Sequence, residues 1–425
     1  MKKVALTLAA IAAATVFAPE ASAVPVFARQ TGMACSACHY QHFPLLNGFG
    51  RAFKNSGFTM MGAQGKVEGE HLDMPDRVNM GVFMTTYVQS ESGLDPVAGQ
   101  VPVIGTPGTG GEFSLFMGGR AAEFLGFIAE AGLGGGGAPV TLAPQGGIVG
   151  ATKFAMLFPV GDARVGLVVH SSTGQGVAYS FETLNTGATN THKMMGNSGP
   201  NGQHVKAAYA AQYLGTNTAA TGASFVANNS MGFVNVGLWE MAGNDAVTGA
   251  NALNLNYARA ATTLDIAGFD MGFGVQHFGG QSTVSGALLT TAAAINAPDA
   301  NIIDAQVQGD AANMPVGLYV SYGSAAASTA TNGNPFNTSL TNTKTSLNVA
   351  AEIGFIPHVS TVQVAMRMGH QNGLTDNALM VGVTYELAQN IGLSLTGTQQ
   401  SGSFWDNQAA PVGKTATTLL LETLF

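Results

Sequence analysis

The stretch LNVAAEIGF, residues 347–355, carries an apolar side chain at every second position, with small or polar residues between them. The stretches TVQVAMRM at 361–368 and LMVGVTYEL at 379–387 repeat this alternation. Because successive side chains of a strand point to opposite faces, each stretch predicts a strand with one apolar face. We expect the apolar faces to meet lipid, while Glu352, Arg367 and Glu386 line an enclosed lumen.

Segments of about ten residues with this alternation recur from Arg77 to Phe425, as in strands that cross a membrane. The predicted connections alternate in length. Short turns are expected near 261–263, 309–313, 356–358 and 388–389, and long loops near 279–300, 324–343 and 401–413. Outer-membrane barrels have short periplasmic turns and longer external loops. The terminal Phe425, preceded by apolar residues and threonines at two-residue steps, resembles the C-terminal insertion signal of such barrels.

The strand count predicts the size of the barrel. Ten segments run from Met231 to Phe425 and five from Arg77 to His170, so an even number requires one or three more between Ser171 and Ser230. The fold class is therefore all-β, a transmembrane outer-membrane β-barrel of about 16 strands, or about 18. A soluble all-β domain with glycine-rich turns is the alternative, but it does not explain the alternating loop lengths.

Composition and targeting favour the same class. The chain has 57 glycines in 425 residues and only 9% charged residues, while 46% are hydrophobic. Its net charge of −8 argues against a nucleic-acid partner. Residues 1–23, with basic Lys2 and Lys3, an apolar stretch and the small residues 21–23, predict a cleaved signal peptide. No later segment offers the ~20 apolar residues of a spanning helix, so strands must cross the membrane, and the predicted location is the cell outer membrane.

The only two cysteines lie in Cys35-Ser36-Ala37-Cys38-His39, the C-x-x-C-H pattern of c-type haem attachment. Two thiols at this spacing can add to the two vinyl groups of one porphyrin edge, and His39 is then placed to bind the iron. A thioredoxin-like pair needs a βαβ surrounding that is not visible here. A zinc site would need two more ligands from a segment that holds only His42 and His71. The prediction is one covalent haem c.

The distal iron ligand is less determined. Met60 or Met61 follows a short linker that can cross the haem face, and a Met/His pair raises the reduction potential above that of a bis-His pair. We take Met60 as the candidate, with His71 as the bis-His alternative. His42 lies three residues after His39, on the same side of a helix, and is expected at the haem edge or the surface. Packing is the other interpretation of the methionines.

About fifty residues, 24–76, precede the barrel at 77–425 and are available to cover the haem. A segment this small seldom buries enough surface to be stable alone. We therefore expect a small helical or irregular cytochrome segment that docks at or in the barrel lumen.

The segments Phe27–Gly32, Cys35–His39 and Phe43–Lys54 resemble the fused monohaem cytochrome and porin family of the outer membrane, which includes iron-oxidising cytochromes. The resemblance covers the first fifty mature residues, and the order of a small cytochrome followed by a barrel matches over the whole chain. It implies haem attachment at Cys35 and Cys38, iron ligation by His39 and a barrel of about 16 strands. Arg51 and Lys54 are of the types that pair with haem propionates, and solvated surface charge is the alternative.

The leading functional hypothesis is outer-membrane electron transfer through this haem, most plainly the oxidation of extracellular Fe(II). Electrons would pass to a periplasmic c-type cytochrome or another soluble carrier. Fe(II) oxidation would make the chain an oxidoreductase acting by one-electron transfer, with no general acid, base or nucleophile. The alternatives are a diffusion porin with a haem-bearing plug or sensor, and an outward, reductase-direction conduit.

Overall fold

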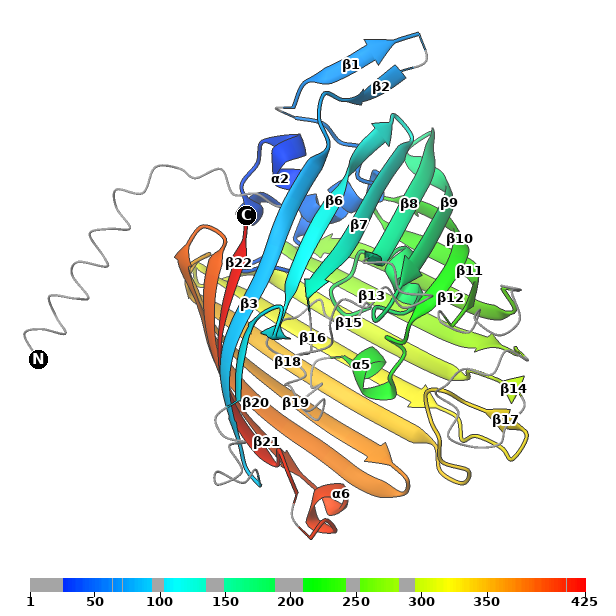
Figure 1. Cartoon of the computed structure of the whole chain (residues 1–425), viewed down its shortest axis with the longest axis vertical. Helices are drawn as coiled ribbons and strands as arrows, with labels where there is room; N and C mark the ends of the chain where they lie inside the picture. The colour runs from blue at the N-terminus through cyan, green and yellow to red at the C-terminus, as the bar shows by residue number, and fades with distance from the viewer. Residues whose placement is uncertain are drawn as a thin grey trace, which may run out of the picture.

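The computed structural model describes residues 26–62, 64–70, 72–93, 103–134, 149–187, 209–241, 253–282, 295–409 and 411–425. They form a closed barrel of 16 antiparallel wall strands (Figure 1). The wall strands are β3 (Asn79–Glu91), β6 (Phe113–Ala122), β7 (Leu125–Gly134), β8 (Val149–Val160), β9 (Ala163–Ser172), β10 (Ala220–Asn229), β11 (Gly232–Glu240), β12 (Leu255–Ile266), β13 (Phe269–Gly280), β15 (Ala300–Ala311), β16 (Met314–Ala325), β18 (Lys344–Ile356), β19 (Ser360–Gln371), β20 (Leu374–Ala388), β21 (Ile391–Ser401) and β22 (Thr415–Leu424).

The predicted fold class and strand number are confirmed. β10 is the single wall strand that the structure describes between residues 171 and 230, which gives 16 rather than 18. One predicted turn was wrong. Residues 261–263 lie inside β12 and pair with residues 272–274 of β13, and the chain reverses at Ala267 and Gly268 instead. Both residues have positive φ, 55° and 80°, as two-residue hairpin turns with the right twist require.

The short turns gather at one end of the barrel. Connections of two or three residues join successive strands at 123–124, 161–162, 230–231, 267–268, 312–313, 357–359 and 389–390. We call this end the short-turn mouth, and the opposite end the long-loop end, although β19 and β20 join there through Asn372 and Gly373 alone. Phe425 closes the ring at the short-turn mouth, since its N–H and carbonyl both bond to Val82 of β3. This mouth faces the periplasm, because short turns and both chain ends lie on that side in outer-membrane barrels.

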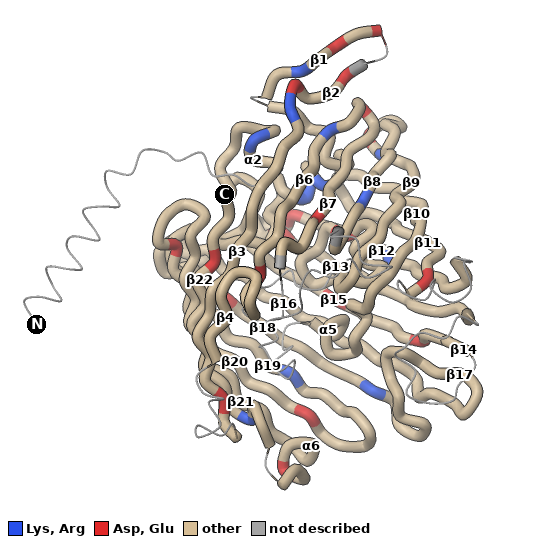
Figure 2. Tube along the Cα trace, in the orientation of Figure 1, with Lys and Arg blue, Asp and Glu red and all other residues tan. Residues whose placement is uncertain are grey.

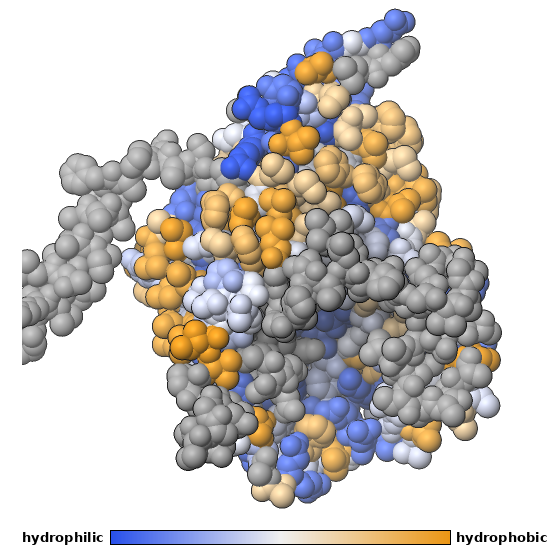
Figure 3. All heavy atoms as spheres, in the orientation of Figure 1, coloured by the Kyte–Doolittle hydropathy of each residue, from blue (hydrophilic) through white to orange (hydrophobic). Residues whose placement is uncertain are grey.

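The outer surface of the wall is apolar. Along β19 the outward side chains Val362, Val364 and Met366 are 40–44% exposed, whereas Gln363 and Arg367 between them are at most 4% exposed. Figure 3 shows hydrophobic side chains across the outside of the upper wall. A closed barrel with an apolar exterior satisfies all its backbone hydrogen bonds within lipid. The wall therefore places the chain in an outer membrane, as predicted. No helix among the described residues is long and apolar enough to cross a membrane.

The N-terminal residues 26–62, which we call the plug, lie in the short-turn mouth. They contain α2 (Val26–Thr31), α3 (Cys35–Cys38) and α4 (Gly48–Asn55). Close packing against the wall requires glycine: a Cβ added to Gly126 of β7 would lie 1.9 Å from the Gly57 carbonyl oxygen, and one on Gly354 of β18 would lie 2.2 Å from Gln41 Oε1. The expectation of a segment docked at or in the lumen is met by this plug. Residues 1–25, which include the predicted signal peptide, lie outside the described residues.

A small hairpin extends beyond the plug, formed by β1 (Lys66–Gly69) and β2 (Leu72–Pro75) (Figure 1). Charged residues are sparse along the wall but frequent on this hairpin, as Figure 2 shows. Lys66 pairs with Glu68 at 2.5 Å and with Asp73 at 3.5 Å, and Asp73 also pairs with Arg120 of β6. The pair with Arg120 ties the hairpin to the wall.

A second segment enters the lumen from the long-loop end. The connection from β9 to β10, described at 173–187 and 209–219 and called here the inward loop, contains the 3-10 helix η1 (Val177–Ser180) and α5 (Ala210–Leu214). Its apolar side chains form a buried cluster with Trp239, Tyr257 and Phe278 of the wall. The wall therefore encloses two insertions, one from each end of the barrel. The remaining short elements are β4 (Val103–Pro107), β5 (Gly110–Gly111), β14 (Ile295–Asn296), β17 (Asn332–Gly333) and α6 (Ser403–Asp406).

Candidate haem attachment site

The C-x-x-C-H motif forms one helical turn that ends at the histidine. α3 covers Cys35–Cys38, and the His39 N–H donates to the Cys35 carbonyl at 2.9 Å. His39 then leaves the helix and pairs with Leu46 as an isolated β-bridge. Its ring Nδ1 lies 3.1 Å from the Leu45 carbonyl oxygen. Iron-binding histidines commonly use one ring nitrogen for such a carbonyl, which fixes the tautomer and directs the other nitrogen, here Nε2, to the metal.

The two thiols are not joined in a disulfide and are partly buried. Cys35 Sγ donates to Asn390 Oδ1 at 3.0 Å, in the turn between β20 and β21. Burial, the Glu386 carboxylate and Cys38 raise the pKa of Cys35 to about 11, and burial also raises the pKa of Cys38. A redox-active cysteine pair works through a lowered thiol pKa. The raised values therefore argue against the thioredoxin-like alternative.

Helix α4 packs directly on the motif. The Asn47 side chain caps α4 by accepting from the Gly50 N–H at 2.9 Å, and its amide donates to the Ala37 carbonyl at 3.0 Å. A Cβ on Gly50 would lie 2.2 Å from the Cys38 carbonyl oxygen, so only glycine allows this approach. The sequence FPLLNGFGRAFK thus folds into a support for the Cys-His turn.

Aromatic rings lead from His39 to the wall. The His39 and Phe43 ring centroids are 5.1 Å apart, those of Phe43 and Phe83 on β3 are 6.1 Å apart, and Phe116 on β6 follows at 6.5 Å. A porphyrin carries a large apolar face that must be covered. Two thiols, a histidine with one oriented nitrogen and neighbouring aromatic rings are a donor set and surroundings that fit a c-type haem.

Met60 lies beside α2, near the link that leads into Cys35. Its carbonyl accepts from Gln30 Nε2 at 2.7 Å, and the next residue but one, Gly62, donates its N–H to the Gln30 carbonyl at 3.2 Å. The Met60 side chain is 37% exposed. Its binding to iron stays a prediction. The bis-His alternative, His71, lies outside the described residues.

His42 and Arg51 dock the plug on the wall. His42 Nδ1 lies 2.9 Å from the Phe43 carbonyl oxygen and Nε2 lies 3.0 Å from Glu352 Oε2 of β18. Its side chain is 7% exposed, so the expectation of a surface histidine was wrong. A position at the haem edge stays a prediction. The Arg51 guanidinium pairs with Asp270 of β13 and is 6% exposed, so the solvated surface charge offered as the alternative for this residue was wrong too.

Asn185 of the inward loop contributes a contact that the sequence pattern did not indicate. Its side chain accepts from the Leu46 N–H at 2.8 Å and donates to the Leu46 carbonyl at 3.0 Å. Leu46 is the residue that pairs with His39. Asn185 is 139 residues away in sequence and lies in a stretch without strand alternation, so no local signal connects it to the motif.

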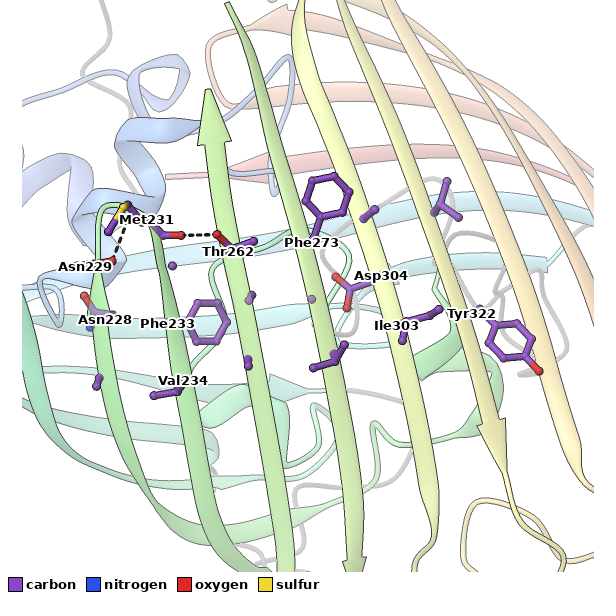
Figure 4. Close-up of a pocket in the computed structure, with 18 of the residues that line it drawn as sticks. Asn228, Asn229, Met231, Phe233, Val234, Thr262, Phe273, Ile303, Asp304 and Tyr322 are labelled. Atoms are coloured by element: carbon purple, nitrogen blue, oxygen red, sulfur yellow. Dashed lines mark hydrogen bonds between the residues drawn. The ribbon is translucent and has the colours of Figure 1, made fainter. Parts of the chain in front are cut away.

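An apolar groove lies elsewhere, on the outside of the wall (Figure 4). Val234, Phe273, Ile303 and Tyr322, from four strands, line it and are 42–56% exposed. Because these side chains face the lipid, the groove is separate from the lumen that holds the Cys-His motif.

No protein-family model matches the chain, and no curated protein matches it. Among solved structures, it is similar to OmpT of Vibrio cholerae, in vitro folded and in a trimer form, with a TM-score of 0.44 and 10% identity over 82% of this chain and 99% of that chain. It is also similar to a mutant of the Rh. blastica porin, with a TM-score of 0.47 and 12% identity over 82% of this chain and 100% of that chain.

Proposed function

We propose that this outer-membrane barrel transfers electrons through one haem c joined to Cys35 and Cys38 in its short-turn mouth. The observation that carries the proposal is the geometry of His39. Its Nδ1 faces the Leu45 carbonyl oxygen at 3.1 Å, and the residue directly follows the helical turn that carries both thiols. This arrangement prepares Nε2 to bind iron.

Each residue has a definite task in this proposal. Cys35 and Cys38 would hold the haem, His39 would supply a ligand to its iron, and Met60 is the candidate for a second ligand. A bound haem supplies one-electron chemistry at its edge. The Phe43 ring lies against His39 and the Phe83 ring lies against Phe43, so both would cover apolar surface of a bound haem.

The proposed donor is extracellular Fe(II), and the proposed acceptor is a periplasmic c-type cytochrome or another soluble carrier. The resemblance of the first fifty mature residues to iron-oxidising cytochromes supports the donor, and the position of the motif at the periplasmic mouth supports the acceptor. Right-side-out proteoliposomes supplied with Fe(II) from outside should show reduction of the haem absorbance. A bulky ferrous chelate, too large for the lumen, is the comparison. Absence of reduction by either form would reject Fe(II) as the donor.

The haem itself is tested by replacing Cys35 and Cys38 together with alanine. The wild type should show a c-type pyridine haemochrome spectrum and a haem-staining band, and the variant should show neither. The variant should still form a heat-modifiable barrel, because strand pairing and lipid-facing burial do not depend on the plug. Wild-type protein without covalent haem would refute the proposal.

The distal ligand and the direction of transfer are tested by redox titration. Met60→Ala should lower the midpoint potential, because a thioether ligand raises it. If His71→Ala changes the spectrum and Met60→Ala does not, the ligands are bis-His. A low wild-type potential would then favour the outward, reductase-direction conduit.

A diffusion porin is the second candidate, and the porin-like barrel with its polar inward faces favours it. Among described residues the plug and the inward loop both occupy the lumen and meet at Leu46 and Asn185. A liposome-swelling assay separates the two functions: a diffusion porin passes small sugars with the plug in place. For the electron-transfer protein we expect swelling only after residues 26–62 are deleted.

A further inference from the structure

The inward loop reaches the plug from the opposite end of the barrel. β9 begins at the short turn 161–162 and ends at Ser172, so the loop after it starts at the long-loop end. It nevertheless extends through the lumen to Leu46, where Asn185 forms two hydrogen bonds with one peptide segment of the plug. Asn185 is 1% exposed. The side-chain amide of Asn185 bonds to both the N–H and the carbonyl of Leu46, as the backbone of a neighbouring strand would.

The Leu45–Leu46 segment is also the one that orients His39. Leu46 forms the β-bridge with His39, and the Leu45 carbonyl oxygen lies 3.1 Å from His39 Nδ1 while accepting from the Tyr40 N–H at 2.8 Å. The position of the Leu45 carbonyl therefore sets the direction of the imidazole ring. A residue that holds the Leu46 N–H also holds this carbonyl, because the two groups belong to the same planar peptide unit.

The backbone of Asn185 is held by the wall, while its side chain contacts the plug. Its N–H donates to Gln306 Oε1 at 2.7 Å, and the next residue, Thr186, donates to Asp304 Oδ1 at 2.6 Å. Both partners belong to β15. Asp304 in turn pairs with Arg259 of β12 at 2.5 Å. The loop tip is thus a fixed point on the barrel, and the plug docks against it.

We propose that Asn185 is a positioning residue for the haem ligand His39, acting through Leu46 and the Leu45 carbonyl. The proposal rests on the proposed haem function and adds to it that the inward loop tunes the site. A histidine N–H that bonds to a carbonyl makes the ring a more basic ligand and so stabilises oxidised iron. Loss of the Asn185 contact should weaken that bond and raise the midpoint potential.

The test compares Asn185→Leu with Asn235→Leu. Asn235 holds the same inward loop by donating to the Ser180 side chain at 2.8 Å and to the Phe181 carbonyl at 2.9 Å, but its bonds lie on the loop and not on the plug. We expect Asn185→Leu to shift the ratio of oxidised to reduced haem several-fold at a given potential, where tenfold corresponds to about 59 mV. The hyperfine-shifted NMR signals of the His39 ring should move as well. Asn185→Ala, which removes both bonds and adds neither bulk nor charge, should shift the potential in the same direction.

Two results would overturn the proposal: a potential and ring signals equal to wild type in both Asn185 variants, or equal shifts in Asn185→Leu and Asn235→Leu. Amide hydrogen exchange at Leu46 and Tyr40 separates this failure from failure of the proposed function. If the wild type carries no haem, the function is refuted. Faster exchange at both amides in Asn185→Leu alone would then still support positioning of the His39 arm, and unchanged exchange would refute it.

Discussion

The plug and the inward loop fill the same lumen from opposite ends, but they differ in how closely their backbones pack on the wall and in how much buried charge anchors them. The plug packs its backbone on the wall where glycines leave room, as at Gly126 and Gly354. The inward loop is anchored by buried charge: Arg259 lies between Glu182 at 2.8 Å and Asp304 at 2.5 Å, all three nearly inaccessible to solvent. Arg51 and His42 of the plug also pair with wall carboxylates, but each pairs with one, whereas Arg259 is enclosed by two. Removal of Arg259 would therefore leave two buried carboxylates unpaired at the anchor of the loop.

The largest expected effect comes from Arg259→Met. It leaves the Glu182 and Asp304 carboxylates buried without a cation, which should cost about 3–5 kcal/mol. Urea unfolding in detergent micelles, followed by tryptophan fluorescence, measures this loss, because Trp239 packs in the cluster that the inward loop forms with the wall. Adding Glu182→Gln and Asp304→Asn should recover most of it. A loss below about 1 kcal/mol would contradict the charge anchor.

A smaller effect is expected from Gly126→Ala, which tests the steric fit of the plug. The new Cβ would lie 1.9 Å from the Gly57 carbonyl oxygen, and overpacking of this kind costs about 1–3 kcal/mol. The plug should become sensitive to protease while the barrel stays heat-modifiable. Gly132→Ala on the same strand is the matched control, because its Cβ would meet nothing within 4 Å. Equal protease sensitivity of the two variants would show that the glycine contact does not hold the plug.

The smallest effect concerns the hairpin, which is held by neither of these means. Partial burial raises the pKa of Asp73, and the Arg120 and Lys66 cations lower it. The effect of the cations is the larger one, so the net pKa shift is downward. A lowered carboxylate pKa contributes stability that is present above the ordinary value of about 3.9 and is lost as the pH falls through the folded value. A spin label at Val67→Cys, an exposed position on the same hairpin, should therefore become more mobile below about pH 4. Asp73→Asn should give the same mobility at pH 7, and a label that stays immobile in that variant would exclude this anchor.

The strands could be predicted because the signal for each one, the alternation of apolar and polar residues, lies within the strand itself. Alternation over residues 347–387 identifies the lipid face strand by strand, and the number of segments limited the barrel to about 16 or about 18 strands. The turn placed at 261–263 was wrong because Ala261 to Thr263 are small and polar residues that also suit an inward face. The chain continues as strand to Ile266, and the reversal depends on the positive φ of Ala267 and Gly268.

The residues of the site could be predicted only where they belong to a sequence motif. Cys35, Cys38 and His39 are identified by spacing, and the structure places them in one turn. His42, Arg51 and Asn185 contact partners that lie 139 to 310 residues away in the sequence. A pattern of neighbouring residues cannot predict contacts over such separations. The same limit applied to the stretch from Ser171 to Ser230, which lacks alternation because most of its described residues, at 173–187 and 209–219, leave the wall.

The plug contacts strands from around much of the barrel, and this has a consequence for assembly in the cell. Asn55 bonds to the β10 backbone, Arg51 pairs with β13, Tyr40 bonds to the backbone of β15 and β16, and Cys35 bonds to the turn after β20. The first residues to be exported thus find their binding surface only after most of the later strands have been inserted. Under the proposed function, the haem is joined to a segment that has not yet docked, and the completed segment enters the mouth as β22 closes on β3.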